Sequence, residues 1–265
     1  MAESLFEPDG ARFVPTELAR GPWSPDALHG GPVAALLART AVAVEADGPM
    51  QPSRLTIELL RPVPLAPLTT KTRVLRPGRK VQLVETSLHS AAHEVARLTM
   101  LRIRSEALAL PAGMGDAPIH PGPAVAAPLR PGWEGDVVAY STHATEHRAV
   151  RGSWTEPGPI VDWIRLRYPV LPGEPLSGVE RVAAAADFGN GVSWVLPFDT
   201  WMFINPDLTI HLHRLPVGEW VCLEAVTLPG PDGIGLAESA LHDERGRIGR
   251  ALQSLLLERR GPAPV

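Results

Sequence analysis

Hydrophobic and polar residues alternate in two short segments of the chain that resemble each other. Residues 55–61 read Leu-Thr-Ile-Glu-Leu-Leu-Arg, and residues 208–214 read Leu-Thr-Ile-His-Leu-His-Arg. Apolar residues at every second position predict a half-buried β-strand in each segment. A weaker echo joins residues 87–89 to residues 240–242, and both echoes share one offset, since 208 − 55 and 241 − 88 both equal 153. The common offset indicates a duplicated unit, and the seam between two similar halves favours a ligand site.

Each half also contains one alanine-rich apolar segment that predicts a helix. Residues 32–40 are rich in Ala and Leu, the best helix formers, and Pro32 suits a first helical turn. Residues 179–187 take the same part in the second half. Because both segments are almost entirely apolar, we expect both helices to be buried. The Phe-Gly-Asn-Gly stretch at residues 188–191 is expected to end the second helix.

The remaining alternating segments predict a run of strands after each helix. They lie at residues 71–75, 80–87 and 95–104 in the first half, and at residues 219–227, 235–242 and 247–258 in the second. The turn at residues 243–246 joins the last two as a hairpin. An antiparallel sheet that curls around one long helix is the hotdog arrangement. We therefore predict an α+β double hotdog of two tandem repeats, each with a long central helix wrapped by an antiparallel β-sheet.

A segment dense in Pro, Ala and Gly separates the two halves at residues 107–133. Such a composition predicts an extended linker. It divides the chain into an N-terminal repeat at residues 1–106 and a C-terminal repeat at residues 134–265.

The composition argues against several classes of protein. Hydrophobic residues make up 45% of the 265 residues, and the net charge of −4 does not suit a nucleic-acid surface, which needs a basic stripe. No apolar run approaches the roughly 20 residues that span a bilayer. Residues 1–10 lack the basic and apolar regions of a signal peptide. We therefore expect a cytoplasmic protein that binds neither nucleic acid nor membrane. Cys222, between two apolar residues, is expected to be a small core residue.

Two polar side chains in apolar segments are candidates for chemistry. Asp187 follows four alanines in the predicted buried helix, where a carboxylate is costly unless hydrogen-bonded, and it lies at the negative end of the helix dipole. A functional site explains this cost, and so does a surface position. Gln253 lies in the last apolar strand and needs hydrogen-bond partners. It could hold a water molecule against Asp187, pair with neighbouring backbone, or face solvent.

His29, Gly30 and Gly31 precede the first helix. The start of a helix offers unpaired backbone N–H groups and a favourable dipole, and glycine allows a ligand to approach closely. If the two central helices run side by side, the Gly30 and Gly31 amides could polarise a substrate carbonyl while Asp187 handles the water. The alternative is that the glycines form only a tight turn. The first helix carries no carboxylate at the equivalent position, so we expect one working site.

The chain resembles the type II acyl-CoA thioesterases over residues 28–259, more weakly in the linker and at residues 140–175. The resemblance rests on the His-Gly-Gly start of the first helix and on residues 59–62, 186–188, 212–214, 219–220 and 246–253. It implies a double hotdog fold, hydrolysis of acyl-CoA thioesters in lipid metabolism, no cofactor and assembly into a homo-oligomer.

The resemblance also implies a catalytic set of Asp, Thr and Gln that bind and activate a water molecule. Asp187 and Gln253 match the Asp and the Gln. An ungapped alignment places Asn205 where the family has Thr, and Thr209 is the nearby alternative. The chain has no Gly-x-Ser-x-Gly elbow, which agrees with direct attack by water.

Three other interpretations follow from the same residues. A hotdog dehydratase or hydratase would need a catalytic His close behind the helix acid, and none follows Asp187. A non-catalytic acyl-binding protein stays open because Asn205 replaces Thr. His211 and His213 share one face of a strand as a metal pair, but no third ligand is clearly placed beside them, so we predict no metal site.

Overall fold

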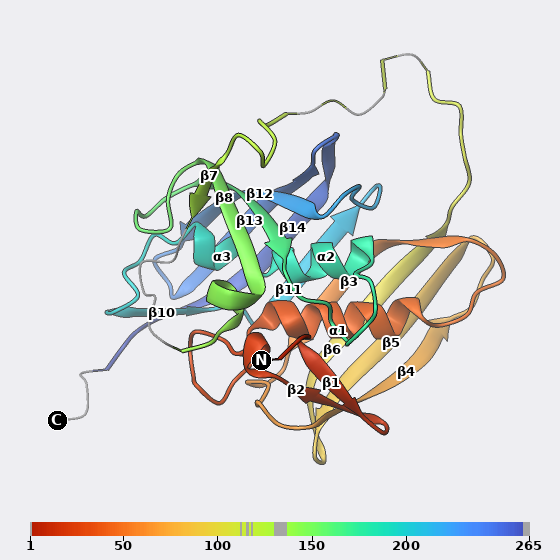
Figure 1. The fold of residues 1–265 in the computed structure, drawn as a ribbon, viewed down its shortest axis with the longest axis horizontal. Coiled ribbons are helices and arrows are strands. Elements are labelled where there is room, and N and C mark those ends of the chain that lie inside the picture. Colours follow the sequence, from red (N-terminus) through yellow and green to blue (C-terminus); the bar gives the residue numbers. More distant parts are fainter. Residues whose placement is uncertain (1, 112, 115–116, 118, 130–136, 262–265) are drawn as a thin grey trace.

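The computed structural model describes residues 2–111, 113–114, 117, 119–129 and 137–261. Within these ranges one sheet of 14 strands runs through both halves of the chain, and neighbouring strands are antiparallel. Two helices lie side by side against one face of this sheet (Figure 1). None of the helices in the described ranges is long and apolar enough to cross a membrane.

The elements follow the chain in a simple order. They are β1 (Phe6–Asp9), β2 (Arg12–Pro15), α1 (Gly30–Val42), β3 (Met50–Leu59), β4 (Leu68–Arg76), β5 (Val81–Ser90), β6 (His93–Arg104), β7 (Ala127–Leu129), β8 (Thr145–Arg151), β9 (Ile160–Leu166), α2 (Gly178–Ala186), α3 (Gly189–Val192), β10 (Trp201–Ile204), β11 (Asp207–Leu212), β12 (Trp220–Pro229), β13 (Ile234–Asp243) and β14 (Gly246–Arg259). Across the sheet the order is β1-β2-β4-β5-β6-β3-β11-β14-β13-β12-β9-β8-β7, and β10 pairs with β14.

The two repeated strands pair with each other where the halves meet. On β3 and β11, Thr56 lies directly opposite Thr209, and these residues are equivalents in the duplication because 209 − 56 equals 153. A local twofold axis therefore passes between them. Their neighbours Leu55 and Ile210 also pair, and both are fully buried. The duplication thus closes the two halves into one continuous sheet.

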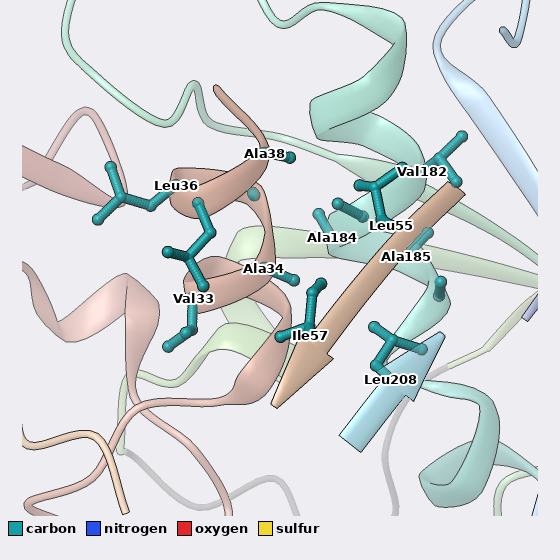
Figure 2. Close-up of a cluster of buried hydrophobic side chains, with 14 of the residues drawn as sticks. Val33, Ala34, Leu36, Ala38, Leu55, Ile57, Val182, Ala184, Ala185 and Leu208 are labelled. Atoms are coloured by element: carbon teal, nitrogen blue, oxygen red, sulfur yellow. The ribbon is translucent and has the colours of Figure 1, made fainter. Parts of the chain in front are cut away.

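Small side chains allow α1 and α2 to pack closely. A Cβ atom on Gly31 would lie 2.7 Å from the carbonyl oxygen of Ala184, so the helices approach to backbone contact at this point. Figure 2 shows Ala34 and Ala38 on the side of α1 that is turned toward α2. Both alanines are buried, so the apolar character of the two segments is explained by a helix pair inside the core.

The two helices run antiparallel. At one end, the imidazole Nδ1 of His29, just before α1, lies 2.8 Å from a carboxylate oxygen of Asp187, just after α2. At the other end, Arg39 in the last turn of α1 lies 3.3 Å from Glu180 in the first turn of α2. Arg39 and Glu180 each lie at the helix end whose dipole favours their charge, whereas Asp187 lies at the negative end of α2 but faces the positive start of α1.

The predicted helices and strands are present, with ends that differ by a few residues, but two expectations were wrong or incomplete. α1 has 13 residues and α2 has nine, so long central helices are not confirmed. The Gly-rich stretch after Asp187 is not a plain break, because α3 begins at Gly189. The prediction also missed several strands, which are β1, β2, β7, β8, β9 and β10.

Part of the predicted linker is packed on the sheet. β7 pairs with β8. The carbonyl oxygen of Pro121 accepts a hydrogen bond of 2.8 Å from the Trp163 indole, and that of Pro123 accepts one of 3.0 Å from Arg148. Residues 112, 115–116, 118 and 130–133 of the predicted linker, and 134–136 of the predicted C-terminal repeat, lie outside the described residues.

Candidate active site

Asp187 lies where the end of α2 meets the start of α1. It is the C-cap residue of α2, its side chain is only 5% exposed, and its carboxylate faces the first turn of α1. A Cβ atom on Gly30 would lie 2.7 Å from both carboxylate oxygens. Only glycine at position 30 therefore leaves room for the carboxylate in this place.

Three side chains from different parts of the chain converge on Asp187. Nδ1 of His29 lies 2.8 Å from Oδ2. Nδ2 of Asn205 donates to Oδ1 at 3.0 Å. Nε2 of Gln253 donates to the same oxygen at 3.4 Å and to the Asp187 backbone carbonyl at 3.2 Å. Hydrogen bonds of this kind offset the cost of burying a carboxylate.

The proton on His29 follows from its two close neighbours. Nδ1 lies 2.8 Å from the Asp187 carboxylate and 3.0 Å from the backbone nitrogen of Gly31. One nitrogen cannot accept a proton from Gly31 and donate one to Asp187 at the same time. A carboxylate at 2.8 Å needs a proton between the two atoms, so Nδ1–H donates to Asp187, and the Gly31 amide donates to the same carboxylate.

These donors keep Asp187 ionised. Burial raises the pKa of Asp187, but the charge and hydrogen bond of His29, together with hydrogen bonds from Asn205 and the Gly31 amide, outweigh it and hold the pKa below its usual value. The carboxylate is therefore a well-oriented acceptor and a weak base at neutral pH.

The orientation of the Gln253 amide is fixed from its other side. Its oxygen accepts a hydrogen bond of 2.9 Å from the backbone N–H of Asn190, so its NH₂ group must face Asp187. The Asn190 side chain donates to the carbonyl oxygen of Phe203 at 2.9 Å. α3, which the sequence analysis did not predict, thus positions the amide of the last strand.

Aromatic rings enclose His29. The Tyr140 and Phe188 rings both lie 4.8 Å from the imidazole, measured between ring centroids. The Tyr140 hydroxyl donates to the carbonyl oxygen of Ala184 at 3.1 Å. Burial and the nearby charge of Asp187 raise the pKa of Tyr140 well above its usual value, so its hydroxyl stays neutral. Sequence analysis did not single out Tyr140, which lies in the region of weak resemblance and carries no periodic signal.

A cluster of aromatic side chains, the aromatic wall, lies beside Asn205. It consists of Trp23, Trp194, Phe198 and Phe203. Phe203 is only 2% exposed, whereas Trp23 is 38% exposed. The aromatic wall therefore extends from the interior beside Asn205 to the surface.

The structure brings six of the seven predicted site residues together. They are His29, Gly30, Gly31, Asp187, Asn205 and Gln253. Thr209 lies elsewhere, because it alternates on β11 with the buried Leu208 and Ile210 and so faces the other side of the sheet.

The Gly31 amide is directed at Asp187, which leaves it unavailable to a substrate carbonyl in this arrangement. His211 and His213 are both exposed. Cys222 is fully buried as expected, and burial raises the pKa of its thiol.

Comparison with protein families gives a match in each half of the chain. Residues 19–103 match the family described as acyl-CoA thioesterase N-terminal domain, and residues 116–257 match acyl-CoA thioesterase C-terminal domain. No curated protein matches the chain.

Several solved structures are similar over nearly the whole chain. A candidate thioesterase II from Thermobifida fusca is 18% identical with a TM-score of 0.73, over 97% of this chain and 96% of that one. A hot dog fold protein from Alicyclobacillus acidocaldarius is 18% identical with a TM-score of 0.69, over 97% and 96%. The acyl-CoA thioesterase II TesB2 from Mycobacterium marinum is 14% identical with a TM-score of 0.67, over 96% and 95%. At these identities the likeness shows the fold alone, which is that of hotdog proteins.

Proposed function

Because this chain belongs to the acyl-CoA thioesterase family, we propose that it hydrolyses acyl-CoA thioesters to a free acid and coenzyme A by direct attack of water. The observation that carries the proposal is the Asp187 carboxylate, which is buried and ionised and faces the start of the neighbouring helix. Holding a charge in that place is costly, and a reaction that uses the charge accounts for the cost.

In this proposal Asp187 and Gln253 orient the attacking water. The water oxygen bonds to the thioester carbonyl carbon while its proton passes to a base, and the C–S bond breaks as coenzyme A leaves as a thiolate that then takes up a proton. A thioester carbonyl is electrophilic and a thiolate leaves readily, so a positioned weak base is sufficient. Such groups contribute about 10²–10⁴-fold to a rate.

Two groups, one on Asp187 and one on His29, can accept the proton of the attacking water. One is the Asp187 carboxylate itself. The other is Nε2 of His29, which carries the lone pair whenever the ring is neutral, because Nδ1 directs its proton at Asp187.

Asn205 takes the place that the family gives to Thr. Its NH₂ group donates to the Asp187 carboxylate at 3.0 Å, and a Thr hydroxyl could donate in the same way. We therefore assign Asn205, and not Thr209, to hold the carboxylate. We assign the substrate carbonyl to the Gly30 amide, since the Gly31 amide already donates to Asp187.

The aromatic wall suits the acyl chain. It combines buried and exposed rings next to Asn205, so an apolar chain that enters at Trp23 could lie along it with its thioester near Asp187.

The test is turnover of a panel of acyl-CoA thioesters, followed by the release of free thiol, with the wild-type chain and with Asp187→Asn. We expect the wild type to turn over at least one thioester and the variant to be slowed by about 10²–10⁴-fold. Binding of acyl-CoA without thiol release would instead favour the acyl-binding alternative. Full activity of a folded Asp187→Asn variant would contradict the assignment of the site.

A further inference from the structure

A second cluster of ligand-type side chains lies on the opposite face of the sheet from Asp187. Glu224 on β12 and His242 on β13 lie diagonally across the strand pair, since Cys222 pairs with His242 and Glu224 pairs with Ala240. The neighbouring residues Leu223 and Leu241 belong to the main core, so Glu224 and His242 point to the outer face. His120 reaches them from the linker segment.

The side chains of His120, Glu224 and His242 converge, but the ring nitrogens of the two histidines make no hydrogen bond to the carboxylate. Nε2 of His120 lies 3.4 Å from Oε2 of Glu224, and Nε2 of His242 lies 3.8 Å from the same oxygen. His242 is only 2% exposed, yet neither of its ring nitrogens makes a hydrogen bond within the described residues, and Nε2 of His120 makes none either. Buried ring nitrogens without a hydrogen bond are costly and need an explanation.

From this geometry we propose that His120, Glu224 and His242 bind one divalent transition-metal ion of the zinc type. Two imidazoles and one carboxylate are ligands that zinc prefers, at bond lengths of about 2.0–2.1 Å. Ligand atoms of a tetrahedron with such bonds are separated by about 3.3 Å. The two distances to Glu224 are already close to this value, and all three ligand atoms lie within 4.8 Å of one another. A small movement of the two imidazoles toward each other would bring all three ligand atoms to the separations of a tetrahedral zinc site.

An ordinary ion pair does not account for the cluster. Nε2 of His242 stands 3.8 Å from the Glu224 carboxylate, which is beyond hydrogen-bond reach, and both of its buried ring nitrogens lack a hydrogen bond within the described residues. The other carboxylate oxygen of Glu224 lies 3.5 Å from Arg151. Two nitrogen ligands disfavour calcium and magnesium, which bind through oxygen atoms.

A water molecule can supply the fourth ligand. Glu224 lines a surface hollow of about 320 Å³ that also contains Arg151 and Arg247, so solvent reaches the carboxylate side of the cluster. Zinc bound by three side chains and a water is a common arrangement.

The ion would attach the linker to the sheet. His120 directly precedes Pro121, whose carbonyl oxygen accepts a hydrogen bond from Trp163 on β9. The site lies on the other face of the sheet from Asp187, so its loss is expected to change stability and leave thioester hydrolysis largely unaffected. Metal binding is therefore measured directly and not through activity.

The experiment uses the full chain after removal of metal with a chelator. Calorimetric titration with Zn²⁺ gives the stoichiometry and Kd, and Co²⁺ in its place gives the visible absorption bands of tetrahedral cobalt. We expect one ion per chain, a Tm that rises with Zn²⁺, and at least tenfold weaker binding in both His242→Gln and His120→Gln. His211→Gln is the matched control, because it removes an exposed histidine from β11 of the same sheet, away from the cluster, and should bind as the wild type does.

Several outcomes would overturn the proposal. They are a wild-type chain without a stoichiometric Zn²⁺ site, unchanged binding in His120→Gln, or equal weakening in His211→Gln. If His242→Gln does not fold, His120→Gln and Glu224→Gln decide, because both residues are partly exposed and their loss should not unfold the chain.

Discussion

A single methyl group at position 30 tests whether the placement of the Asp187 carboxylate controls the reaction. Gly30 is the first residue of α1 and is not among the residues with positive φ, so alanine suits its backbone. The new Cβ atom would stand 2.7 Å from both carboxylate oxygens, closer than folded proteins allow. The carboxylate must therefore retreat, and its hydrogen bonds with His29 and Asn205 must lengthen.

The expected size of the Gly30→Ala effect follows from two opposing contributions to the free energy of unfolding and one contribution to the reaction rate. Replacing glycine by alanine where the backbone conformation suits both stabilises a protein by about 0.4–1 kcal/mol. Overpacking of a close-packed region costs about 1–3 kcal/mol. The free energy of unfolding should therefore fall by about 0–2.6 kcal/mol, which for a chain of this size lowers Tm by about 2–4 °C per kcal/mol. A reacting group displaced by about 1 Å can cost about 10²-fold, so we expect kcat/KM to fall by about 10²-fold, or about 2.7 kcal/mol.

The assay is thiol release from the best acyl-CoA substrate, with Tm measured on the same preparations. Gly191→Ala is the matched control, since it adds the same methyl group to α3, where the Cβ atom meets nothing within 4 Å. Gly30→Ala should lose activity while it stays folded, and Gly191→Ala should keep it. Wild-type activity in Gly30→Ala would refute the reasoning, because the carboxylate cannot stay where it is.

Three further predictions concern the same carboxylate. Asp187→Asn should lower kcat/KM by about 10²–10⁴-fold, whereas Asp243→Asn, which alters another buried, hydrogen-bonded carboxylate, should lower Tm without a comparable loss of kcat/KM. Asn205→Thr should keep activity and Asn205→Ala should lower it about tenfold or more, because only the first retains a donor to Asp187; equal rates in steady-state assays would count against this role. The pKa values of Asp187 and Asp243 both lie below the unfolded value of about 3.9. Their stabilisation is therefore complete above that pH and is lost as the pH falls through the folded-state values, so urea unfolding should show a loss below about pH 4 that is smaller in Asp187→Asn.

Strong periodicity made the long strands and both core helices predictable from the sequence, and weak periodicity hid the rest. β3 and β11 alternate clearly and were found from the repeat. β8 was missed because its inward positions include His147, which pairs with Asp162 at 2.7 Å inside the core. A buried His–Asp pair reads as polar in a hydrophobicity pattern, so a strand that buries one carries no apolar alternation.

A local signal in the sequence likewise distinguishes the site residues that were predicted from those that were missed. Asp187 and Gln253 were found because each is a polar residue in an apolar segment, which is unusual locally. Tyr140 and the cluster of His120, Glu224 and His242 have no local signal, since their neighbours in space come from distant parts of the chain. Their roles depend on sheet register and on where the linker packs, and neither is encoded in the spacing of residues along the sequence.

The twofold architecture gives a reason why the proposed reaction would use one end of the helix pair and not both. At the proposed reactive end, the start of α1 faces a carboxylate supplied by α2, and the absence of a side chain at Gly30 and Gly31 leaves room for this carboxylate and for the close approach of Ala184. At the equivalent opposite end, the start of α2 is closed by its own residues, because Ser177 and Glu180 form a reciprocal capping box. Arg39 then pairs with Glu180, so a cation stands at the end of α1 where the reactive end has its carboxylate. The two helix junctions are therefore similar in arrangement but not in chemistry, since one end holds an ion pair and the other holds a carboxylate directed at the first turn of α1.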